Sequence, residues 1–450
     1  MVAKLEWGHK ISNQSMRFRC LIIPTFALLF PMSASSQATK DIAHLENPNR
    51  KPTSAMAIAL DNAWQRHPQA LALDAHDKAA RSAIELADKL TPGPGAIAVS
   101  GRDDRVRGVQ GRQEIEVELS VPLWLPKQRF ARQAEANALA TEALAKRHAL
   151  RWQLAGEVRD AWWSLATARS AKIIAERRFA TAQSLASEVQ RRYQTGEVSR
   201  IELNLAQSET NNAQTELIES ETNLQLSEQH FQSLTGTAAP IDLSEEQIDE
   251  KSQNQTTEFA LQNQTTQGLD WVMLEKNPQL VAAISAAHTA QARLKLAEHS
   301  SREAPEIALR AVRERELGSA PFSNGVGIQL KLPFSFGAQV QRDSALALAN
   351  LIETSTEVQR LRERNQAEAA RIAQLLLRSE QLVRIARDNH ALASDNQGLA
   401  DKAFSLGEID LAALLRVRAA TFAAESSLER QRLQRASLIS KRQQVRGILP

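Results

Sequence analysis

One feature limits what this chain can fold into: more than a hundred residues, from Lys127 to Ala239, contain no proline. Ala, Glu, Gln, Leu and Arg recur through this run at helical spacing, and before Gly236 only Gly156 and Gly196 interrupt the pattern. A chain that is helical on both sides of one glycine forms two helices joined by a turn. The first, over 127–193, would be roughly 100 Å long. We therefore expect extended helical hairpins, because such a helix is too long for a compact globule.

The same order of features occurs twice in the chain. Three pairs of landmarks are 210, 211 and 211 residues apart: Pro68 with Pro278, Pro122 with Pro333, and Gly196 with Gly407. Such regular spacing indicates an internal duplication. We predict two units of helix, two strands, long helix, turn and shorter helix, over 39–243 and 269–450. The segment 244–268 is rich in Gln, Asn, Thr and Glu and is predicted to be a polar linker.

The helical pattern also predicts how each unit packs. In the first unit it covers 54–90, interrupted near His67-Pro68, then 127–193 and 200–234. In the second unit it runs from Pro278 to about Ser301, over 339–404, and finally to about Arg446. The flanking helices of a unit, laid end to end, are about as long as the central helix. We expect them to pack along it as a two-stranded rod in coiled-coil fashion.

Four short segments have the alternating pattern of strands. Ile97 and Val99 begin one, and 306–313 and 326–332 form the pair of the second unit. The clearest is 114–121, in which Ile, Val, Leu and Val alternate with three Glu residues and a Ser. Each strand is about nine residues long, the length of a tilted membrane-crossing strand, and each has one apolar and one polar face.

These strands cannot cross a membrane as one open sheet, because backbone groups at its edges would have no partners in hydrocarbon. Four strands are too few to close a barrel, for which about eight is the practical minimum. Several copies must pool their strands, and three copies would give twelve. The polar face would then line a pore: Glu114, Glu116, Glu118, Arg310, Gln329 and Lys331. The alternative is a soluble four-stranded sheet with its apolar face against a helical core.

The N-terminus has the three parts of a secretory signal peptide. Arg17 and Arg19 precede an apolar run from Cys20 to Phe30, and small residues follow up to Ala38. We expect a signal peptide over 1–38, with translation starting at Met16 and cleavage after Ala38 or Ala34, and the alternative is a short N-terminal anchor. Cys20 is the single cysteine and begins the apolar run instead of following it, so a lipoprotein cleavage site is not supported. No other window has the roughly 18 consecutive apolar residues of a spanning helix.

Composition and motifs argue against catalysis. The 55 basic and 52 acidic residues are interspersed, so the net charge of +3 marks no nucleic-acid surface. The nine histidines occur at no helical ligand spacing, and neither a glycine-rich phosphate loop nor a Gly-x-Ser-x-Gly motif is present. We predict no enzyme activity, no cofactor and no metal site. Trp152, Trp162 and Trp163 are predicted to pack between helices.

Two turn sequences and two strand ends carry a family resemblance. The turns are Tyr193-Gln194-Thr195-Gly196-Glu197-Val198-Ser199 and Phe404-Ser405-Leu406-Gly407-Glu408-Ile409-Asp410, and the strand ends are Ser120-Val121-Pro122-Leu123 and Lys331-Leu332-Pro333-Phe334. With the signal peptide and the duplication, they resemble the bacterial outer membrane efflux protein family typified by TolC. The Gly-Glu-Val-Ser turn, Asn277-Pro278-Gln279-Leu280 and the short mature chain are most similar to its CzcC-like cation-efflux branch.

The resemblance implies a mainly helical homotrimer with a twelve-stranded outer-membrane β-barrel and a periplasmic tunnel of helices. It implies a passive exit duct that serves an inner-membrane resistance-nodulation-division (RND) pump through a periplasmic adaptor, with cations such as Co, Zn or Cd as cargo. By motif position, the adaptor-contacting tips would be Tyr193, Gly196, Glu197, Val198, Ser199, Phe404, Gly407, Glu408, Ile409 and Asp410.

The chain departs from the family at two places. Relatives often carry acidic residues just after the second tip, where this chain has Ala413 and Arg416, and the acidic residue after the first tip is Glu202. Glu202 and Arg416 are our candidates for the periplasmic gate. Tyrosine occurs once, so an aromatic girdle would rest on few residues: Trp124, Phe322, Phe334 and Phe336. The alternative function is a secreted helical scaffold outside the membrane; an adaptor-like protein would have one hairpin, not two.

Overall fold

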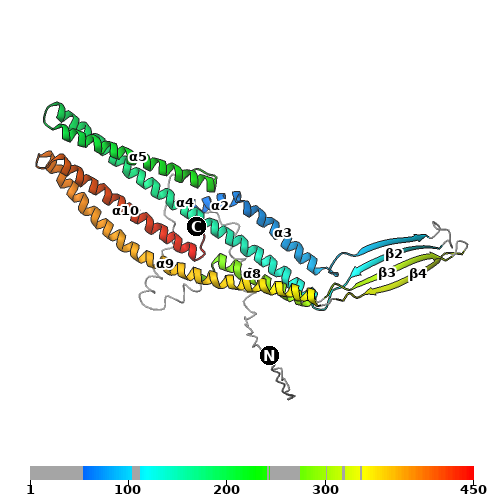
Figure 1. Ribbon diagram of the computed structural model, residues 1–450. Helices are drawn as coiled ribbons and strands as arrows, with labels where there is room; N and C mark the ends of the chain where they lie inside the picture. Colours follow the sequence, from blue (N-terminus) through cyan, green and yellow to red (C-terminus); the bar gives the residue numbers. More distant parts are fainter. Residues whose placement is uncertain are drawn as a thin grey trace, which may run out of the picture. The chain divides into compact units, whose positions relative to one another are not determined.

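The computed structural model describes residues 54–103, 112–240, 243, 274–300, 302–316, 320–334 and 337–450. They all belong to one compact unit of the chain, Lys51–Pro450. Within it, long helices extend to one end and a four-stranded sheet forms the other (Figure 1). The predicted signal peptide, the predicted linker and Phe336 lie outside the described residues.

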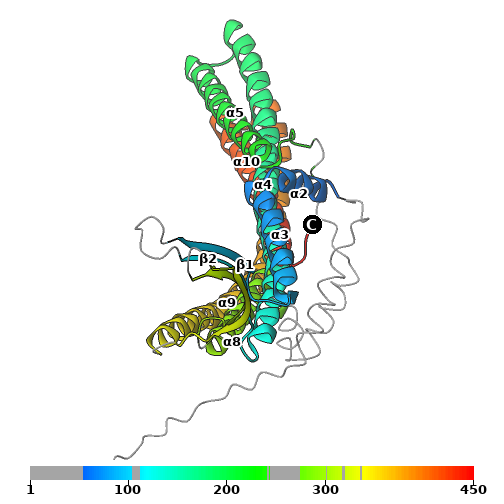
Figure 2. The same cartoon turned by 90° about the vertical axis from the view of Figure 1, so that its right-hand side faces the viewer.

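The first half of the chain is built on α4 (Gln128–Gln194), one helix of 67 residues. Before it, α2 (Ala55–Arg66) and α3 (Pro68–Asp88) are separated at His67, because the proline that follows cannot continue the helical hydrogen bonds. After it comes α5 (Arg200–Thr235). Figure 2 shows α3 along the part of α4 nearer the sheet and α5 along the other part. The predicted packing of short helices along a long one is confirmed.

The second half repeats this arrangement on α9 (Ala338–Ser405), a helix of 68 residues. α8 (Pro278–His299) packs along the part of α9 nearer the sheet, and α10 (Leu411–Val445) along the other part. α8 also packs against α4, which joins the two halves. Of the helices described, none combines the length and the apolar character needed to cross a membrane.

The sheet is antiparallel, in the order β1-β2-β3-β4. Its strands are β1 (Ala96–Asp103), β2 (Gln113–Pro122), β3 (Glu306–Arg315) and β4 (Ser323–Lys331). Each half supplies one hairpin, and the β2–β3 pair joins them. The predicted mainly helical fold with two strands per unit is therefore confirmed.

The main hydrophobic core lies midway along α4, where α2, α5 and α10 meet it. Leu154, Val158 and Trp162 of α4 pack there with Phe231 of α5. Trp162 is 1% and Trp163 is 6% exposed, so these rings are packed between helices as predicted. A second core lies beneath the two hairpin turns and contains residues from α4, α5, α9 and α10.

Each half of the chain ends against its own beginning. α5 is followed by Gly236 (φ 74°), where an added Cβ would lie 2.3 Å from Nη1 of Arg66 at the end of α2. Gly447 (φ 80°), just after α10, packs in the same way on Pro278 at the start of α8, where the distance would be 2.9 Å. Both positions favour glycine for its φ, and at Gly447 the ring of Pro278 and the backbone beside it also leave little room for a side chain. They are 211 residues apart, so the joint is duplicated as well.

Candidate functional sites on the sheet and the hairpin tips

The sheet register places the six predicted pore residues on one face. In the ladder, Glu118 is opposite Arg310, and Glu306 is opposite Lys331. Because side chains alternate between faces, every second residue of each strand joins this set. Its members include all those predicted: Glu114, Glu116, Glu118, Arg310, Gln329 and Lys331.

Ion pairs between side chains of neighbouring strands stabilise this polar face. Nε of Arg310 lies 2.5 Å from Oε1 of Glu116 and 2.9 Å from Oε2 of Glu118. Nζ of Lys331 lies 3.2 Å from Oε2 of Glu306. Near its centre the face thus carries two carboxylates for one guanidinium. Glu114, near the end of β2 and opposite Arg102 in the ladder, is a further carboxylate, without an ion pair among the described residues.

The opposite face of the sheet is apolar and exposed. Its side chains are between 40% and 78% exposed: Ile97, Val99, Ile115, Val117, Leu119, Ile307, Leu309, Val326, Ile328 and Leu330. A sheet in water normally buries its apolar side and solvates its polar side. Here the apolar side is exposed along all four strands, whereas the polar side is exposed on β1 and β4 and mostly half-buried on β2 and β3. The apolar patch is too extended for scattered surface residues. The alternative of a soluble sheet that rests on a helical core is wrong.

The two hairpin tips share one backbone conformation. Gly196 and Gly407 have φ angles of 78° and 77°. At the first tip the N–H of Glu197 donates to the carbonyl of Arg192 at 2.9 Å, and an equivalent bond of 2.9 Å closes the second. This bond satisfies a carbonyl at the helix end and requires a left-handed residue beside it, which explains both glycines.

The ten predicted contact residues fall into two groups. Seven are exposed at the ends of the hairpins: Tyr193, Gly196, Glu197, Ser199, Gly407, Glu408 and Asp410. The other three, Val198, Phe404 and Ile409, are half-buried and pack on the core beneath the tips. The guanidinium of Arg192 lies 5.5 Å from the ring centre of Phe404, which joins the tips directly. The three apolar residues therefore hold the tips together, and the seven others are accessible.

The structure gives Glu202 a local role. Its carboxylate accepts the N–H of Ser199 at 2.8 Å, and the Ser199 hydroxyl accepts the N–H of Glu202 at 3.3 Å. This reciprocal capping box stabilises the start of α5. At the second tip, Asp410 caps α10 by accepting the N–H of Ala413 at 2.7 Å. Arg416 is exposed on α10, and no ion pair of the described residues joins it to Glu202.

A buried arginine in the middle of α4 was not predicted. Arg159 is 1% exposed; it hydrogen-bonds the side chain of Gln444 and donates to the carbonyl of Ile448 at 3.0 Å. Gln444 in turn donates to the carbonyl of Trp152 at 2.7 Å. The one sequence signal was Gly156 inside a long helix. A Cβ there would lie 3.0 Å from Nε2 of Gln444, so the glycine makes room for the end of α10.

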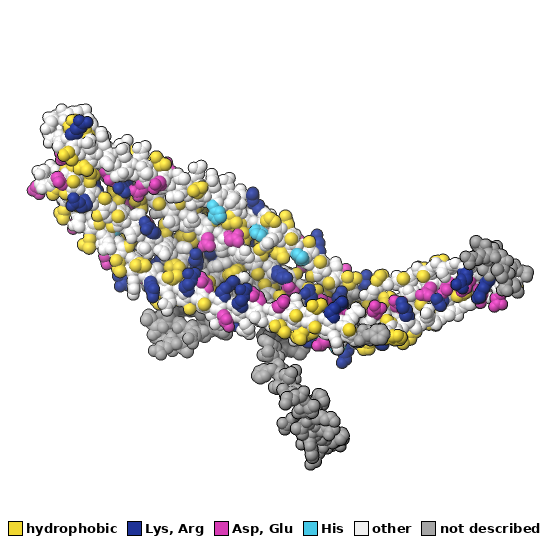
Figure 3. Space-filling view, in the orientation of Figure 1, with side chains coloured by type: hydrophobic (Ala, Val, Ile, Leu, Met, Phe, Trp, Pro, Cys, Tyr) yellow, Lys and Arg dark blue, Asp and Glu magenta, His cyan; other side chains and the backbone are white. Residues whose placement is uncertain are grey.

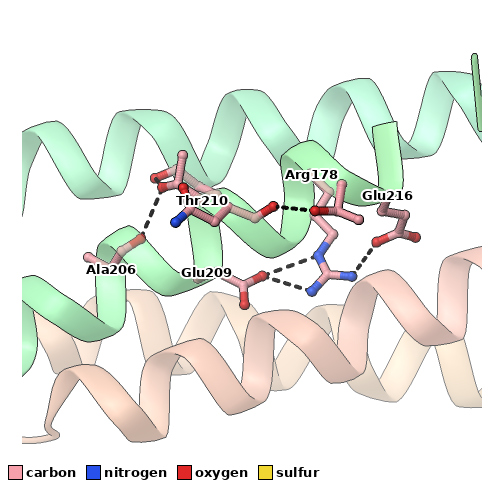
Figure 4. A network of polar contacts seen from close by, with 8 residues as sticks. Arg178, Ala206, Glu209, Thr210 and Glu216 are labelled. Carbon is pink, nitrogen blue, oxygen red and sulfur yellow. Dashed lines mark hydrogen bonds and ion pairs between the residues drawn. The ribbon is translucent and has the colours of Figure 1, made fainter. Parts of the chain in front are cut away.

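A second polar network pins α5 to α4 (Figure 4). Arg178 of α4 lies between Glu209, at 2.9 Å from its Nη2, and Glu216, both on α5. Burial alone would lower the pKa of Arg178, but hydrogen bonds and charge from both carboxylates raise it above its usual value. The corresponding residues of the second hairpin cannot form it: Asn389, Ala420 and Ser427. That hairpin instead pairs Arg418 with Asp401 at 2.7 Å.

No metal centre is evident in the part of the chain that the structure describes, because it contains no group of three or more His, Cys, Asp or Glu side chains that could hold an ion.

Comparisons with known proteins agree with this geometry. Residues 59–237 match the family model of the outer membrane efflux protein. No curated protein matches the sequence. The fold is similar to VceC, an outer membrane protein of Vibrio cholerae, at 14% identity and a TM-score of 0.69, covering 87% of this chain and 96% of that one. The Campylobacter jejuni outer membrane channel CmeC is similar at 13% identity and a TM-score of 0.68, covering 87% and 85%.

A third similar structure is the transmembrane channel CusC, at 14% identity and a TM-score of 0.68, covering 87% of this chain and 92% of that one. Identities this low show the fold alone, so the sequence link to the family rests on residues 59–237. The chain therefore has the fold of outer-membrane channels, and its first half carries the sequence pattern of the outer membrane efflux protein family, which supports the TolC-like family for this protein.

Proposed function

We propose that this protein is the outer-membrane channel of a tripartite efflux system, a passive exit duct without catalytic activity. The observation that carries the proposal is the sheet with its exposed apolar face and its ion-paired polar face. An exposed apolar face is favoured only in an apolar surrounding such as lipid. An ion-paired polar face is favoured only in contact with water or a polar cargo.

The open edges of the sheet support a trimer. In one chain, β1 and β4 each have a neighbour on one side only, and lipid supplies no partner for their free backbone groups. Pooling the four strands of three chains gives a closed barrel of twelve. The polar face would then line its lumen, and the helices would form a periplasmic tunnel that continues the path.

The hairpin tips, at the far end from the sheet, are the proposed contact with a periplasmic adaptor that links the duct to an inner-membrane RND pump. Their seven exposed residues are accessible for it. The adaptor and the pump would supply specificity and energy, and the duct contributes a continuous polar route.

Cations are the cargo suggested by the resemblance to the CzcC-like branch. Part of that resemblance has a structural explanation. Asn277 caps α8 by accepting the N–H of Gln279 at 3.0 Å, and its amide donates to the carbonyl of Val445 at 3.1 Å. The Asn-Pro motif thus has a structural role at the joint between α8 and the end of α10. Growth of a deletion strain on cobalt, zinc and cadmium salts, against the same strain on dyes and antibiotics, tests the cargo.

Fractionation of cells that express the protein tests the proposal itself. We expect it in the outer-membrane fraction, and as a trimer after mild detergent extraction and native electrophoresis. A monomer in the soluble periplasmic fraction would refute the channel and favour the helical scaffold, which leaves the exposed apolar face unexplained.

A further inference from the structure

Two arginines lie on the apolar face of the sheet, at the end farthest from the helices. Arg313 and Arg315 continue the series of β3 residues that includes Ile307 and Leu309, and Arg313 is opposite Ile115 in the ladder. Side chains of both charges occur at this end of the molecule (Figure 3). The two guanidiniums are thus on the side of the sheet that the proposed function assigns to lipid.

The guanidinium groups of both arginines lie against one aromatic ring, that of Phe322. The guanidinium carbons of Arg313 and Arg315 lie 4.6 Å and 4.8 Å from the ring centre of Phe322. They are therefore within about 9 Å of each other, a distance at which like charges repel. The negative face of the ring offsets part of this repulsion. An anion that contacts both guanidiniums would remove the rest.

Most N–H groups of Arg313 and Arg315 have no hydrogen-bond partner among the described residues. Arg315 donates from Nη2 to Oε1 of Gln113 at 2.6 Å, while its Nε is buried without a hydrogen-bond partner. Neither arginine has an ion pair among the described residues. Asp103 lies on the same face, opposite Gln113, and its carboxylate accepts a hydrogen bond of 2.9 Å from the Gln113 amide. Glu314 is on the other face, 3.9 Å from Arg112.

We infer that Arg313 and Arg315, positioned by Phe322, form a binding site for the phosphate of an anionic lipid headgroup. The guanidinium fork matches phosphate oxygens and forms charge-assisted hydrogen bonds with them. Ile307 and Arg313 are six residues apart on one strand, or roughly 20 Å. Strands of membrane barrels are tilted by about 35–45°, so this length corresponds to about 15 Å along the membrane normal. The two arginines directly follow Ala311, the last apolar residue of this series on β3, so the pair lies where the apolar face ends.

This inference rests on the proposed function, because the site requires lipid against the apolar face. The test reconstitutes the full protein in phosphatidylcholine vesicles, with or without a minor fraction of phosphatidic acid, whose headgroup is a phosphate monoester. Lipid retained after mild detergent extraction is identified by native mass spectrometry. Arg313→Gln, Arg315→Gln and Phe322→Leu are compared with Arg112→Gln, which removes a cation from the same end but the opposite face.

We expect retention of phosphatidic acid by the wild type and by Arg112→Gln, with about tenfold weaker retention when either guanidinium is lost. Phe322→Leu should weaken it as well, because the two cations are no longer held together. Equal retention by all variants would overturn the site. Complete displacement by inorganic phosphate alone would also overturn it, since the ligand would then be a free anion.

Insertion of the protein into vesicles distinguishes a failure of the proposed function from a failure of the lipid site. If protease protection shows that the protein does not enter vesicles, the proposed function fails, and with it the site. If all variants insert alike but retain phosphatidic acid equally, only the lipid site is refuted.

Discussion

At the scale of single residues, the tip turns show that backbone conformation alone can decide which residue a position accepts. Gly407 has φ 77°, and an added Cβ would meet no atom within 4 Å. Gly398, in the interior of α9, is equally open. A left-handed conformation costs an L-residue about 1–2 kcal/mol, whereas alanine is about 1 kcal/mol better than glycine inside a helix. The same substitution should therefore have opposite effects at the two positions.

We predict that Gly407→Ala lowers the free energy of unfolding by about 1 kcal/mol, and that Gly398→Ala raises it by up to about the same amount. Thermal unfolding of the two purified variants in one detergent measures both. Gly196→Ala should resemble Gly407→Ala, because its φ is 78° and its surroundings are also open. Shifts of the same sign for Gly407→Ala and Gly398→Ala would contradict the conformational explanation.

Residues whose role follows from local rules could be predicted, and those with distant partners could not. Gly196 was predictable because a helix end and a following turn are neighbours in sequence. The capping box of Ser199 and Glu202 could also have been found, since the spacing is a known signal; its family position instead suggested a gate. Arg159 could not, because an arginine on a long helix is normally solvated and its partner Gln444 is 285 residues away.

At the scale of the elements, adjacent residues of one strand lie on opposite faces of the sheet and so in two different environments. Ile328 on the apolar face is 77% exposed, and its neighbour Gln329 is on the polar face, opposite Ala308. The alternation was predictable because a strand places successive side chains on opposite faces. The pairing of Arg310 with both Glu116 and Glu118 was not, because it depends on the register between strands of different halves.

A lysine at each of these adjacent positions tests the faces. We predict that Ile328→Lys reduces assembly into the outer membrane, since a lysine on the lipid face costs about 2–4 kcal/mol near the bilayer centre. Gln329→Lys should assemble normally because it faces the lumen. Quantitative immunoblots of membrane fractions measure both, and equal yields would exclude lipid on the apolar face.

At the scale of the whole molecule, the order of elements was predictable because the landmarks recur at a fixed interval. The closure of a barrel is not contained in one chain, since the described part of the chain supplies four strands. In the proposed trimer, the polar faces of three sheets would surround one lumen. Glu114 has no ion pair among the described residues, although Arg102 is opposite it in the ladder. Three copies would place three such carboxylates around the lumen, and this ring should favour passage of cations.

Electrical measurement of reconstituted trimers tests this ring. Glu114→Gln should lower the preference for cations, seen as a smaller reversal potential in a salt gradient. Arg313→Gln, on the outer face, is the control and should leave the reversal potential unchanged. An unaltered reversal potential in Glu114→Gln would remove Glu114 from the conducting path.

The two glycine joints have a consequence for protein engineering. Gly236 ends the first half against Arg66, and Gly447 ends the second half against Pro278, so the end of each half contacts its own beginning. A cut between the halves would keep each joint within one polypeptide, and the two parts could meet again through β2 with β3, α4 with α8 and α4 with α10. Two half-length polypeptides, each exported by its own leader, should therefore complement each other in one cell, whereas halves divided at Gly196 should not.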